Sequence, residues 1–381
     1  NGRLRVEKPP LVNWLHLAGF ALCGRNETGA RIGSALLTIG TCLLTWQIGC
    51  RLLGPSVGLL SGLVLATCVW TAVGGRAATP DAPLVFCTTL AFYLFVRGCG
   101  FRAGIPADGA DGHTPAVSLR AAAAIGAACG AATLAKGPIG LVLPLASFLL
   151  FALFAAWHGH PRSLPSLWAG LRGIRPGMIV LAAVAVAAPW YVWVAIRTDG
   201  AWLRDFLLVH NVGRFAAPME GHSGSLLYYP AVVAVGLFPW SIVLAAMLAH
   251  AAAILRSPGD ERRGPLALVA SWMLVWIGAF SCAGTKLPGY IWPAYPALAI
   301  ATAVLLDDWA GGRAVFSWLH MPRGFRSPRA TTDHAPDHAI GLVMRRLPQP
   351  LPGTGAVAEY AELGNFGMRV IMSYQIGRAH V

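Results

Sequence analysis

Hydrophobic positions along this chain fall into long blocks, and short polar segments rich in Gly and Pro separate the blocks. The apolar runs are 32–53, 57–74, 82–96, 121–135, 139–157, 177–196, 226–249, 266–282 and 290–306. Most approach the roughly 20 residues that an α-helix needs to cross a bilayer. They are too long and too continuous for the strands of a membrane barrel. The pattern predicts an all-α, polytopic transmembrane helical bundle with about nine spans.

Two segments fit this pattern less well. The apolar run 11–23 is too short to span, and we expect an interfacial helix there. The run 121–135 is rich in Gly and Ala, which membrane helices tolerate because small residues allow close packing. The predicted organisation is an outer loop segment with an interfacial helix at 1–31, a transmembrane domain at 32–309, and a cytoplasmic or artefactual tail at 310–381.

The composition agrees with a membrane protein. Hydrophobic residues make up 56% and charged residues only 12% of the chain, against about 25% charged in a soluble domain. The formal net charge of +13 is explained by basic residues on cytoplasmic loops, because no basic run interleaved with aromatics indicates a nucleic-acid surface. The 8 cysteines form no CxxC pair and lie mostly in apolar runs, which predicts neither a disulfide framework nor a zinc site.

Following the chain through these spans assigns each loop to a side. One side receives most of the arginines and is cytoplasmic by the positive-inside rule. The other side receives the segments 1–31, 75–81, 136–138, 197–225 and 284–288. Each of these holds charged residues in a compact motif with Gly or Pro, so the topology gathers the unusual motifs on the outer face.

Each charged motif has an ordinary interpretation beside a functional one. Lys8, next to Glu7, suits a phosphate near the membrane surface, or it belongs to a solvated proline turn. Asp81 precedes a span, where a carboxylate either caps the helix or points into an outer cavity. Lys136 and Lys286 adjoin apolar spans, so each needs a partner or a route to water. The ordinary interpretation is that each side chain snorkels to the membrane interface.

The loop 197–225 contains the densest cluster of polar chemistry. His210, Arg214, Glu220 and His222 are suited to binding a metal or a phosphate, although an ordinary solvated connection fits as well. No HExxH spacing is present, so the metal signal is weak. The absence of Walker A, Rossmann and GxSxG patterns argues against an ATP-driven transporter, a soluble nucleotide-sugar enzyme and an α/β hydrolase.

Taken together, these motifs resemble bacterial glycosyltransferase family 39. The segments that carry the resemblance are Glu7-Lys8-Pro9-Pro10, Arg76…Pro80-Asp81, Ala135-Lys136-Gly137-Pro138, Pro189-Trp190-Tyr191, His210-Asn211…Arg214-Phe215, Glu220-Gly221-His222-Ser223-Gly224, Phe238-Pro239-Trp240-Ser241 and Gly284-Thr285-Lys286-Leu287-Pro288…Pro293-Ala294-Tyr295-Pro296. The family groups with protein O-mannosyltransferases and the aminoarabinose transferase of lipid A, all with the GT-C fold.

The resemblance implies a bacterial inner-membrane enzyme that moves a sugar from a polyprenyl-phosphate carrier to a lipid A-like or protein acceptor on the outer face. It implies inverting transfer without a nucleotide. The residues expected to act are the catalytic carboxylates Asp81 and Glu220, the carrier-phosphate cations Lys8, Arg214, Lys136 and Lys286, and a divalent-metal pair of Glu7 and His210. The expected partners are the sugar donor, the acceptor and membrane lipids.

Family members carry a first helix and an outer loop with an acidic pair ahead of the Glu-Lys-Pro motif. By the resemblance, this chain begins after that loop and is a fragment, which puts its own catalytic competence in doubt. The alternative function is a polytopic lipid or solute transporter or flippase. Transporters usually show internal repeats and charges near the membrane midplane, whereas this chain shows no repeat and places its charged motifs at one face.

Overall fold

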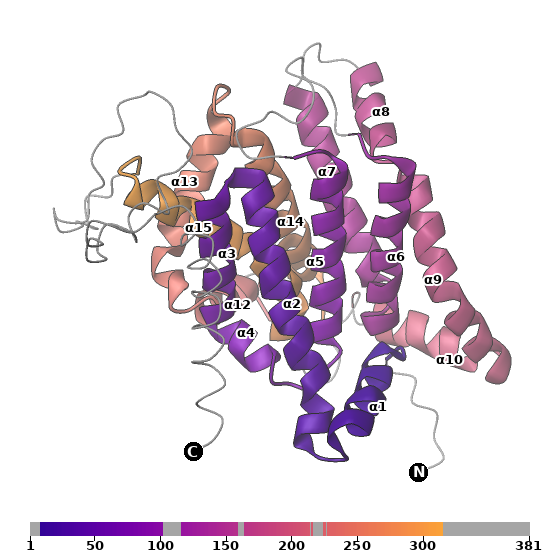
Figure 1. Ribbon diagram of the computed structural model, residues 1–381. Helices are drawn as coiled ribbons and strands as arrows, with labels where there is room; N and C mark the ends of the chain where they lie inside the picture. Colours follow the sequence, from indigo (N-terminus) through magenta and orange to yellow (C-terminus); the bar gives the residue numbers. More distant parts are fainter. Residues whose placement is uncertain are drawn as a thin grey trace, which may run out of the picture. The chain divides into compact units, whose positions relative to one another are not determined.

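Regular structure is helical throughout the part of the chain that the computed structural model describes, with no strand in it (Figure 1). That part comprises residues 8–101, 116–158, 164–213, 215, 224–225 and 227–314. The chain divides into two compact units, Asn1–Pro328 and Arg329–Val381, and the described residues belong to the first. The predicted tail at 310–381 therefore lies outside the described residues from 315 onward.

The helices follow one another with short connections. In chain order they are α1 (Leu11–Cys23), α2 (Glu27–Leu53), α3 (Pro55–Thr67), α4 (Val69–Gly74), α5 (Asp81–Gly98), α6 (Leu119–Lys136), α7 (Ile139–His158), α8 (Leu164–Gly173), α9 (Pro176–Arg197), α10 (Ala201–Arg204), the π-helix η1 (Asp205–Gly213), α12 (Tyr228–Gly236), the 3-10 helix η2 (Trp240–Val243), α13 (Leu244–Arg256), α14 (Arg263–Cys282), the 3-10 helix η3 (Pro288–Ala294) and α15 (Tyr295–Ala310).

The first helices show how local sequence sets the boundaries. The side chain of Asn26 accepts a hydrogen bond of 2.8 Å from the backbone N–H of Gly29, which caps the start of α2. Gly54 ends α2 with a positive φ of 105°, and Pro55 then opens α3, where its fixed φ suits the first helical position. The predicted interfacial helix is α1, whose exposed side chains include Trp14, Leu17 and Leu22.

The Gly- and Ala-rich run forms a regular helix, α6, and glycine explains its packing against α9. A Cβ on Gly126 would lie 2.3 Å from the carbonyl oxygen of Ile179, and one on Gly130 would lie 2.7 Å from that of Ala183. The two backbones are therefore too close for larger residues. Small residues let membrane helices pack at this separation, so the low hydropathy of α6 reflects a packing requirement.

Each of the nine predicted runs coincides with helical structure, but the count of nine spans is not confirmed. Six helical segments are long and apolar enough to cross a membrane: Glu27–Leu53, Asp81–Gly98, Ile139–Trp157, Trp168–Arg197, Arg263–Cys282 and Pro288–Ala310. The apolar helices Pro55–Thr67 and Trp240–Arg256 are shorter. The chain is a multi-pass membrane protein, and helix breaks divide two of the runs that the hydropathy pattern treats as continuous.

Aromatic stacking holds the centre of the bundle together. The ring of Phe92 in α5 stacks on Trp272 of α14 at a centroid distance of 3.6 Å, and Phe95 stacks on Phe148 of α7 at 4.2 Å. These side chains are buried. Helix α5 is thereby fixed between α7 and α14, and its first residue, Asp81, is held at the end of the bundle where α6 finishes (Figure 1).

Candidate functional site

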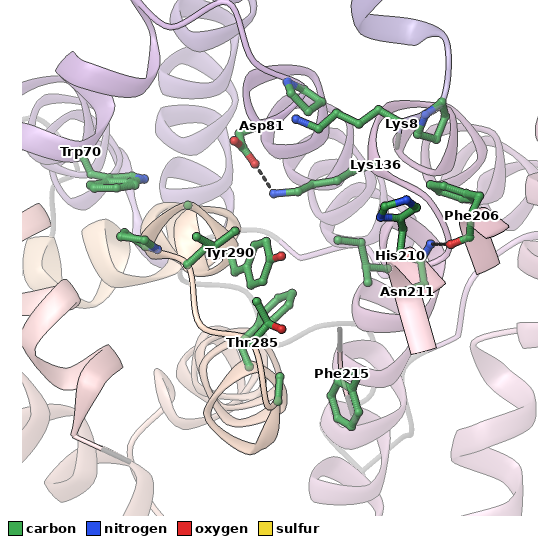
Figure 2. Close-up of a pocket in the computed structure, with 18 residues that line it drawn as sticks. Lys8, Trp70, Asp81, Lys136, Phe206, His210, Asn211, Phe215, Thr285 and Tyr290 are labelled. Carbon is green, nitrogen blue, oxygen red and sulfur yellow. Dashed lines mark hydrogen bonds and ion pairs between the residues drawn. The ribbon is translucent and has the colours of Figure 1, made fainter. Parts of the chain in front are cut away.

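A pocket of about 360 Å³ lies where the start of α5, the end of α6, η1 and the loop before η3 meet (Figure 2). Its lining residues are Lys8, Pro9, Trp70, Pro80, Asp81, Lys136, Ile139, Phe206, His210, Asn211, Phe215, Phe280, Ala283, Thr285, Leu287, Pro288, Gly289 and Tyr290. Four side chains that the sequence singled out, Lys8, Asp81, Lys136 and His210, therefore lie around one cavity. They come from segments far apart in the chain.

An ion pair between Asp81 and Lys136 forms one wall of the pocket. The ammonium group of Lys136, the last residue of α6, donates to Oδ1 of Asp81, the first residue of α5. Both side chains are largely buried, with 16% of Lys136 and 22% of Asp81 exposed. The partner that a lysine next to apolar spans requires is thus a carboxylate, which is a different solution from snorkelling to the surface. In the described chain no backbone N–H caps onto this carboxylate.

The 3-10 helix η3, which precedes α15, packs against the same ion pair. The Nζ atom of Lys136 lies 4.8 Å from the centroid of the Tyr290 ring, a cation–π distance. A Cβ placed on Gly289 would lie 3.4 Å from Oδ2 of Asp81, so the backbone there runs beside the carboxylate. The charges of the pair are therefore enclosed by an aromatic face on one side and by main chain on the other.

The π-helix η1 brings His210 and Asn211 to the pocket. Its i→i+5 geometry is rare and is often found at functional sites. The side-chain amide of Asn211 donates a 2.7 Å hydrogen bond to the carbonyl of Phe206 within the same element. The Nδ1 atom of His210 is buried and has no hydrogen-bond partner in the described chain. This leaves a polar ring atom available at the pocket wall.

Gly137 allows η1 to lie directly against the end of α6. Its φ of 93° is in the region that favours glycine, and a Cβ there would lie 2.7 Å from Cζ of Phe206. The ring of Phe206 also stacks on Trp202 at 4.7 Å. Trp202 in turn meets Trp190 of α9 edge to face at 4.9 Å. This aromatic cluster fixes the height and direction of η1, and with them the position of His210.

Lys8 reaches the pocket from the segment just before α1. The two following residues, Pro9 and Pro10, are buried, and Pro9 lines the pocket as well. Because the proline rings fix the local backbone, packing sets the position of Lys8, whose residue is exposed overall. Lys8 thus adds a second lysine side chain to the pocket lining, next to Lys136.

Lys286 takes a different position. It is 5% exposed and does not line the pocket. Its ammonium donates to the carbonyls of Ser281 at 2.7 Å and Ala283 at 3.1 Å, at the end of α14, and lies 5.6 Å from the Tyr229 ring centroid. The orphan carbonyls of a helix C-terminus favour a cation there. Lys286 thus anchors the loop whose neighbours Thr285 and Leu287 do line the pocket, and its contact with a carrier phosphate stays a prediction.

Three of the predicted site residues, Glu7, Arg214 and Glu220, lie outside the described residues. The predicted metal pair can therefore be assessed only through His210. Within the described ranges no group of three or more His, Cys, Asp or Glu residues is arranged to hold a metal ion. The unpaired Nδ1 of His210 offers one nitrogen ligand, which is fewer than a protein metal site ordinarily needs.

Four aromatic residues of the pocket, Trp70, Phe206, Phe280 and Tyr290, stand outside the motifs that the sequence pattern singles out. Trp70 lies within a predicted span, and the break that turns it toward the pocket occurs at Cys68, where the backbone is extended with φ −75° and ψ 145°. No Gly or Pro marks this break. Tyr290 directly follows the Lys286-Leu287-Pro288-Gly289 segment, and this closeness to a charged turn was the available signal.

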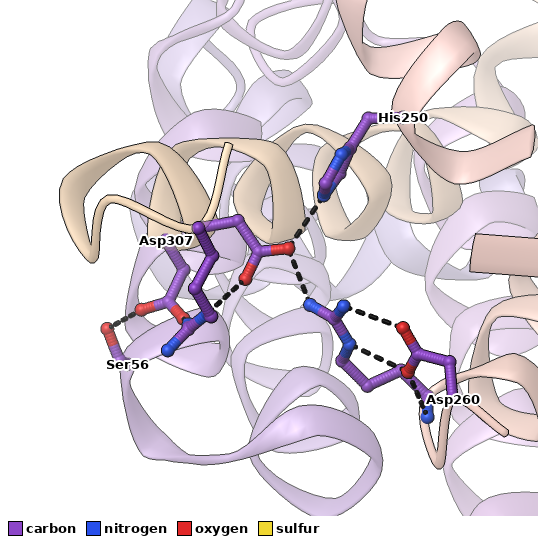
Figure 3. A network of polar contacts seen from close by, with 7 residues as sticks. Ser56, His250, Asp260 and Asp307 are labelled. Carbon is purple, nitrogen blue, oxygen red and sulfur yellow. Dashed lines mark hydrogen bonds and ion pairs between the residues drawn. The ribbon is translucent and has the colours of Figure 1, made fainter. Parts of the chain in front are cut away.

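A second polar cluster lies at the start of α14 and the end of α15 (Figure 3). Asp308, whose side chain is 2% exposed, accepts hydrogen bonds from Nε2 of His250 at 2.6 Å and Nε of Arg313 at 2.7 Å. Arg262 bridges it to Asp260, and the hydrogen bonds from Arg262 lower the pKa of Asp260. Every charged group in this cluster has an internal partner, so it joins helix ends and leaves no charge for a ligand.

Comparison with known proteins identifies similar sequences. Residues 7–106 match the dolichyl-phosphate-mannose-protein mannosyltransferase family. An uncharacterized protein of Aquifex aeolicus is 28% identical over 79% of this chain and 60% of its own length. The undecaprenyl phosphate-alpha-4-amino-4-deoxy-L-arabinose arabinosyl transferase 1 of Pseudomonas fluorescens is 28% identical over 84% of this chain and 50% of its own length. The chain thus spans about half to three fifths of these relatives.

Solved structures give the same result for the fold. ArnT from Cupriavidus metallidurans bound to undecaprenyl phosphate superposes with a TM-score of 0.63 and 25% identity, over 79% of this chain and 50% of that one. Its apo form gives a TM-score of 0.61 at the same identity. These findings confirm the resemblance indicated by the motifs: the chain is similar in sequence and in fold to glycosyltransferases of the GT-C type.

The substitution Gly137→Ala should destabilise the contact between α6 and η1. At φ 93° and ψ −162°, a backbone region that essentially only glycine adopts, an alanine costs about 1–3 kcal/mol, and its Cβ would collide with Phe206. We expect a lower midpoint of thermal unfolding in detergent. Gly177→Ala is the matched control, because nothing lies within 4 Å of the added Cβ and its φ is not positive. Equal midpoints for the two variants would contradict this account of Gly137.

The substitution Asp308→Asn should cost roughly 1–3 kcal/mol, because it removes the charge from a buried acceptor that His250, Arg262 and Arg313 share, while Arg262 keeps Asp260 and Arg313 keeps Asp307. Asp307→Asn is the control, since Asp307 bonds Ser56 and the exposed side of Arg313 and should cost at most about 1 kcal/mol. Thermal unfolding of both variants measures the difference. An Asp308→Asn protein as stable as the Asp307→Asn protein would show that the cluster does not stabilise the fold.

Proposed function

We propose that this chain is the membrane-embedded part of a glycosyltransferase that moves a sugar from a polyprenyl-phosphate carrier to an acceptor hydroxyl. The observation that carries the proposal is the convergence of Lys8, Asp81, Lys136 and His210 on one pocket at one end of the bundle. The similarity to arabinosyl transferases and to a structure bound to undecaprenyl phosphate supports it. The relatives described above that have a stated activity are transferases, which gives the transporter alternative no support.

The proposed reaction uses the two sides of the pocket differently. The bond between the sugar C1 and the carrier phosphate breaks while a bond from C1 to the acceptor oxygen forms. The phosphate leaves with increased negative charge, and Lys8 is placed to stabilise that charge where it develops. Arg214 is proposed to assist from the segment outside the described residues. This division makes Lys8 a donor-binding residue whose effect grows in the transition state.

Asp81 is the proposed base. The proton of the acceptor hydroxyl passes to its carboxylate as the new glycosidic bond forms. Lys136 binds one carboxylate oxygen and so fixes the orientation of the other, which lies beside Gly289. This geometry favours an orienting role for Lys136 alongside the phosphate contact predicted for it. Glu220 remains the second proposed carboxylate.

A divalent metal at Glu7 and His210 also remains part of the proposal. His210 presents an unpaired ring nitrogen at the pocket wall, which would suit one position in such a site, where the ion would add positive charge near the phosphate. No step of the proposed transfer depends on it. Metal analysis of purified full-length protein, with His210→Ala for comparison, measures whether a metal is held there.

We propose that the pocket faces the outside of the bacterial inner membrane. Arginines at the opposite helix ends support this orientation under the positive-inside rule. The described residues concerned are Arg51, Arg97, Arg120, Arg172, Arg175, Arg256, Arg262, Arg263 and Arg313. The proposed acceptor is a lipid A-like molecule or a protein, and a carrier lipid with its sugar on the outer face needs no nucleotide at this site.

Replacing Lys8 with alanine should weaken binding of polyprenyl phosphate and reduce sugar transfer by roughly 10- to 100-fold, the effect expected for one lost hydrogen bond to a charged group. The assay follows radiolabel from polyprenyl-phosphate sugars into acceptor, using full-length protein in proteoliposomes. Arg25→Ala removes an exposed cation that does not line the pocket and is the control. Undiminished transfer by the Lys8→Ala protein would contradict the proposed phosphate contact.

A further inference from the structure

The tryptophan at the far wall of the pocket combines two properties. Trp70 lines the pocket, and its indole Nε1 is buried without a hydrogen-bond partner in the described chain. Figure 2 shows the ring across the pocket from His210, with its nitrogen on the edge turned toward the other labelled residues. An indole N–H can only donate, so its partner must be an acceptor that these residues do not supply.

An unpaired indole alone is not evidence for a ligand. Trp272 and Trp276 also have buried Nε1 atoms without partners, and both belong to the apolar core and do not line the pocket. Trp70 differs because a cavity adjoins it. Leaving a buried donor unpaired costs roughly 1–3 kcal/mol, and a ligand that accepts from it recovers part of that cost.

The backbone around Trp70 is arranged to hold the ring at the cavity. Helix α3 ends at Thr67, and the extended backbone of Cys68 redirects the chain before α4. The N–H of Val69 donates to the carbonyl of Phe238 at 3.0 Å. A Cβ on Gly236 of α12 would lie 3.2 Å from Cβ of Trp70. The neighbouring helix therefore packs closely against the tryptophan and limits its movement.

Lys8 and Trp70 suit different chemical groups of a ligand in the pocket. Lys8 provides a full positive charge for the carrier phosphate, and the ion pair of Asp81 with Lys136 is close to the proposed reacting bond. Trp70 offers a neutral donor, which suits an uncharged sugar hydroxyl, and an aromatic surface, which suits the apolar face of a sugar ring. A cavity of about 360 Å³ is at the small end for ligand sites and suits one sugar with its phosphate better than donor and acceptor together.

We infer that Trp70 is a specificity-determining residue whose indole N–H donates a hydrogen bond to a hydroxyl of the transferred sugar distant from C1. This inference rests on the proposed function, since it presupposes a sugar carried on lipid phosphate. It assigns the far wall to the sugar, and the acceptor then approaches from another side. Discrimination among sugars follows, because a site built to bond a hydroxyl disfavours a sugar that lacks it.

The test compares wild type with Trp70→Phe, which keeps an aromatic ring and removes the N–H. Full-length protein in proteoliposomes receives polyprenyl-phosphate sugars and a series of their deoxy analogues. We expect Trp70→Phe to lower kcat/KM for the natural donor roughly tenfold. For one deoxy analogue, wild type and variant should be equally efficient, because the partner hydroxyl is already absent. Binding of sugar-free polyprenyl phosphate should be unchanged.

Trp272→Phe is the matched control, because it removes a buried, unpaired N–H from the core, and neither Trp272 nor its stacking partner Phe92 lines the pocket. Wild-type kcat/KM in Trp70→Phe would overturn the inference. Equal weakening of sugar-free and sugar-bearing carrier, or a change confined to the KM of the acceptor, would overturn it as well. A wild-type protein that transfers no sugar from any donor would instead contradict the proposed function.

Discussion

The ion pair between Asp81 and Lys136 is the interaction on which the pocket depends. Each residue stands at a helix end beside apolar sequence, where an unpaired charge is costly. Their contact joins the start of α5 to the end of α6 and places a carboxylate at the pocket wall. Tyr290 and Gly289 then close around it. Two charges that the membrane disfavours individually are held together as one oriented polar group.

Close helix packing makes this arrangement possible. Gly126 and Gly130 let α6 approach α9. Gly137, directly after the last residue of α6, lets Phe206 of η1 pack against the end of that helix. The aromatic cluster around Trp202 then fixes η1, so His210 faces the same cavity as the ion pair. At the other end of the bundle the buried carboxylate of Asp308 ties helix ends together. The glycines and the Asp308 cluster thus hold the helices together, and the Asp81–Lys136 pair forms part of the pocket.

The sequence predicted the helices and the convergence of charged motifs for a physical reason: long apolar runs specify spans, and alternating topology sends their connecting loops to defined sides. It predicted α1 with its observed boundaries. It did not predict the break at Cys68, which carries no Gly or Pro, so Trp70 was assigned to a continuous span. It did not predict the hydrogen bonds from Lys286 to the carbonyls at the end of α14, which depend on tertiary contacts, and the phosphate contact of Lys286 stays a prediction. Outcomes for Glu7, Arg214 and Glu220 lie outside the described residues.

The central claim is that Asp81 and Lys136 act as one unit in sugar transfer. A double-mutant cycle measures this most directly, with turnover of a polyprenyl-phosphate sugar by full-length protein carrying Asp81→Asn, Lys136→Met or both. The account predicts that each single change lowers kcat by about 100-fold or more. It further predicts that the double variant is no slower than the slower single variant. Losses that multiply, or normal turnover in Asp81→Asn, would contradict it.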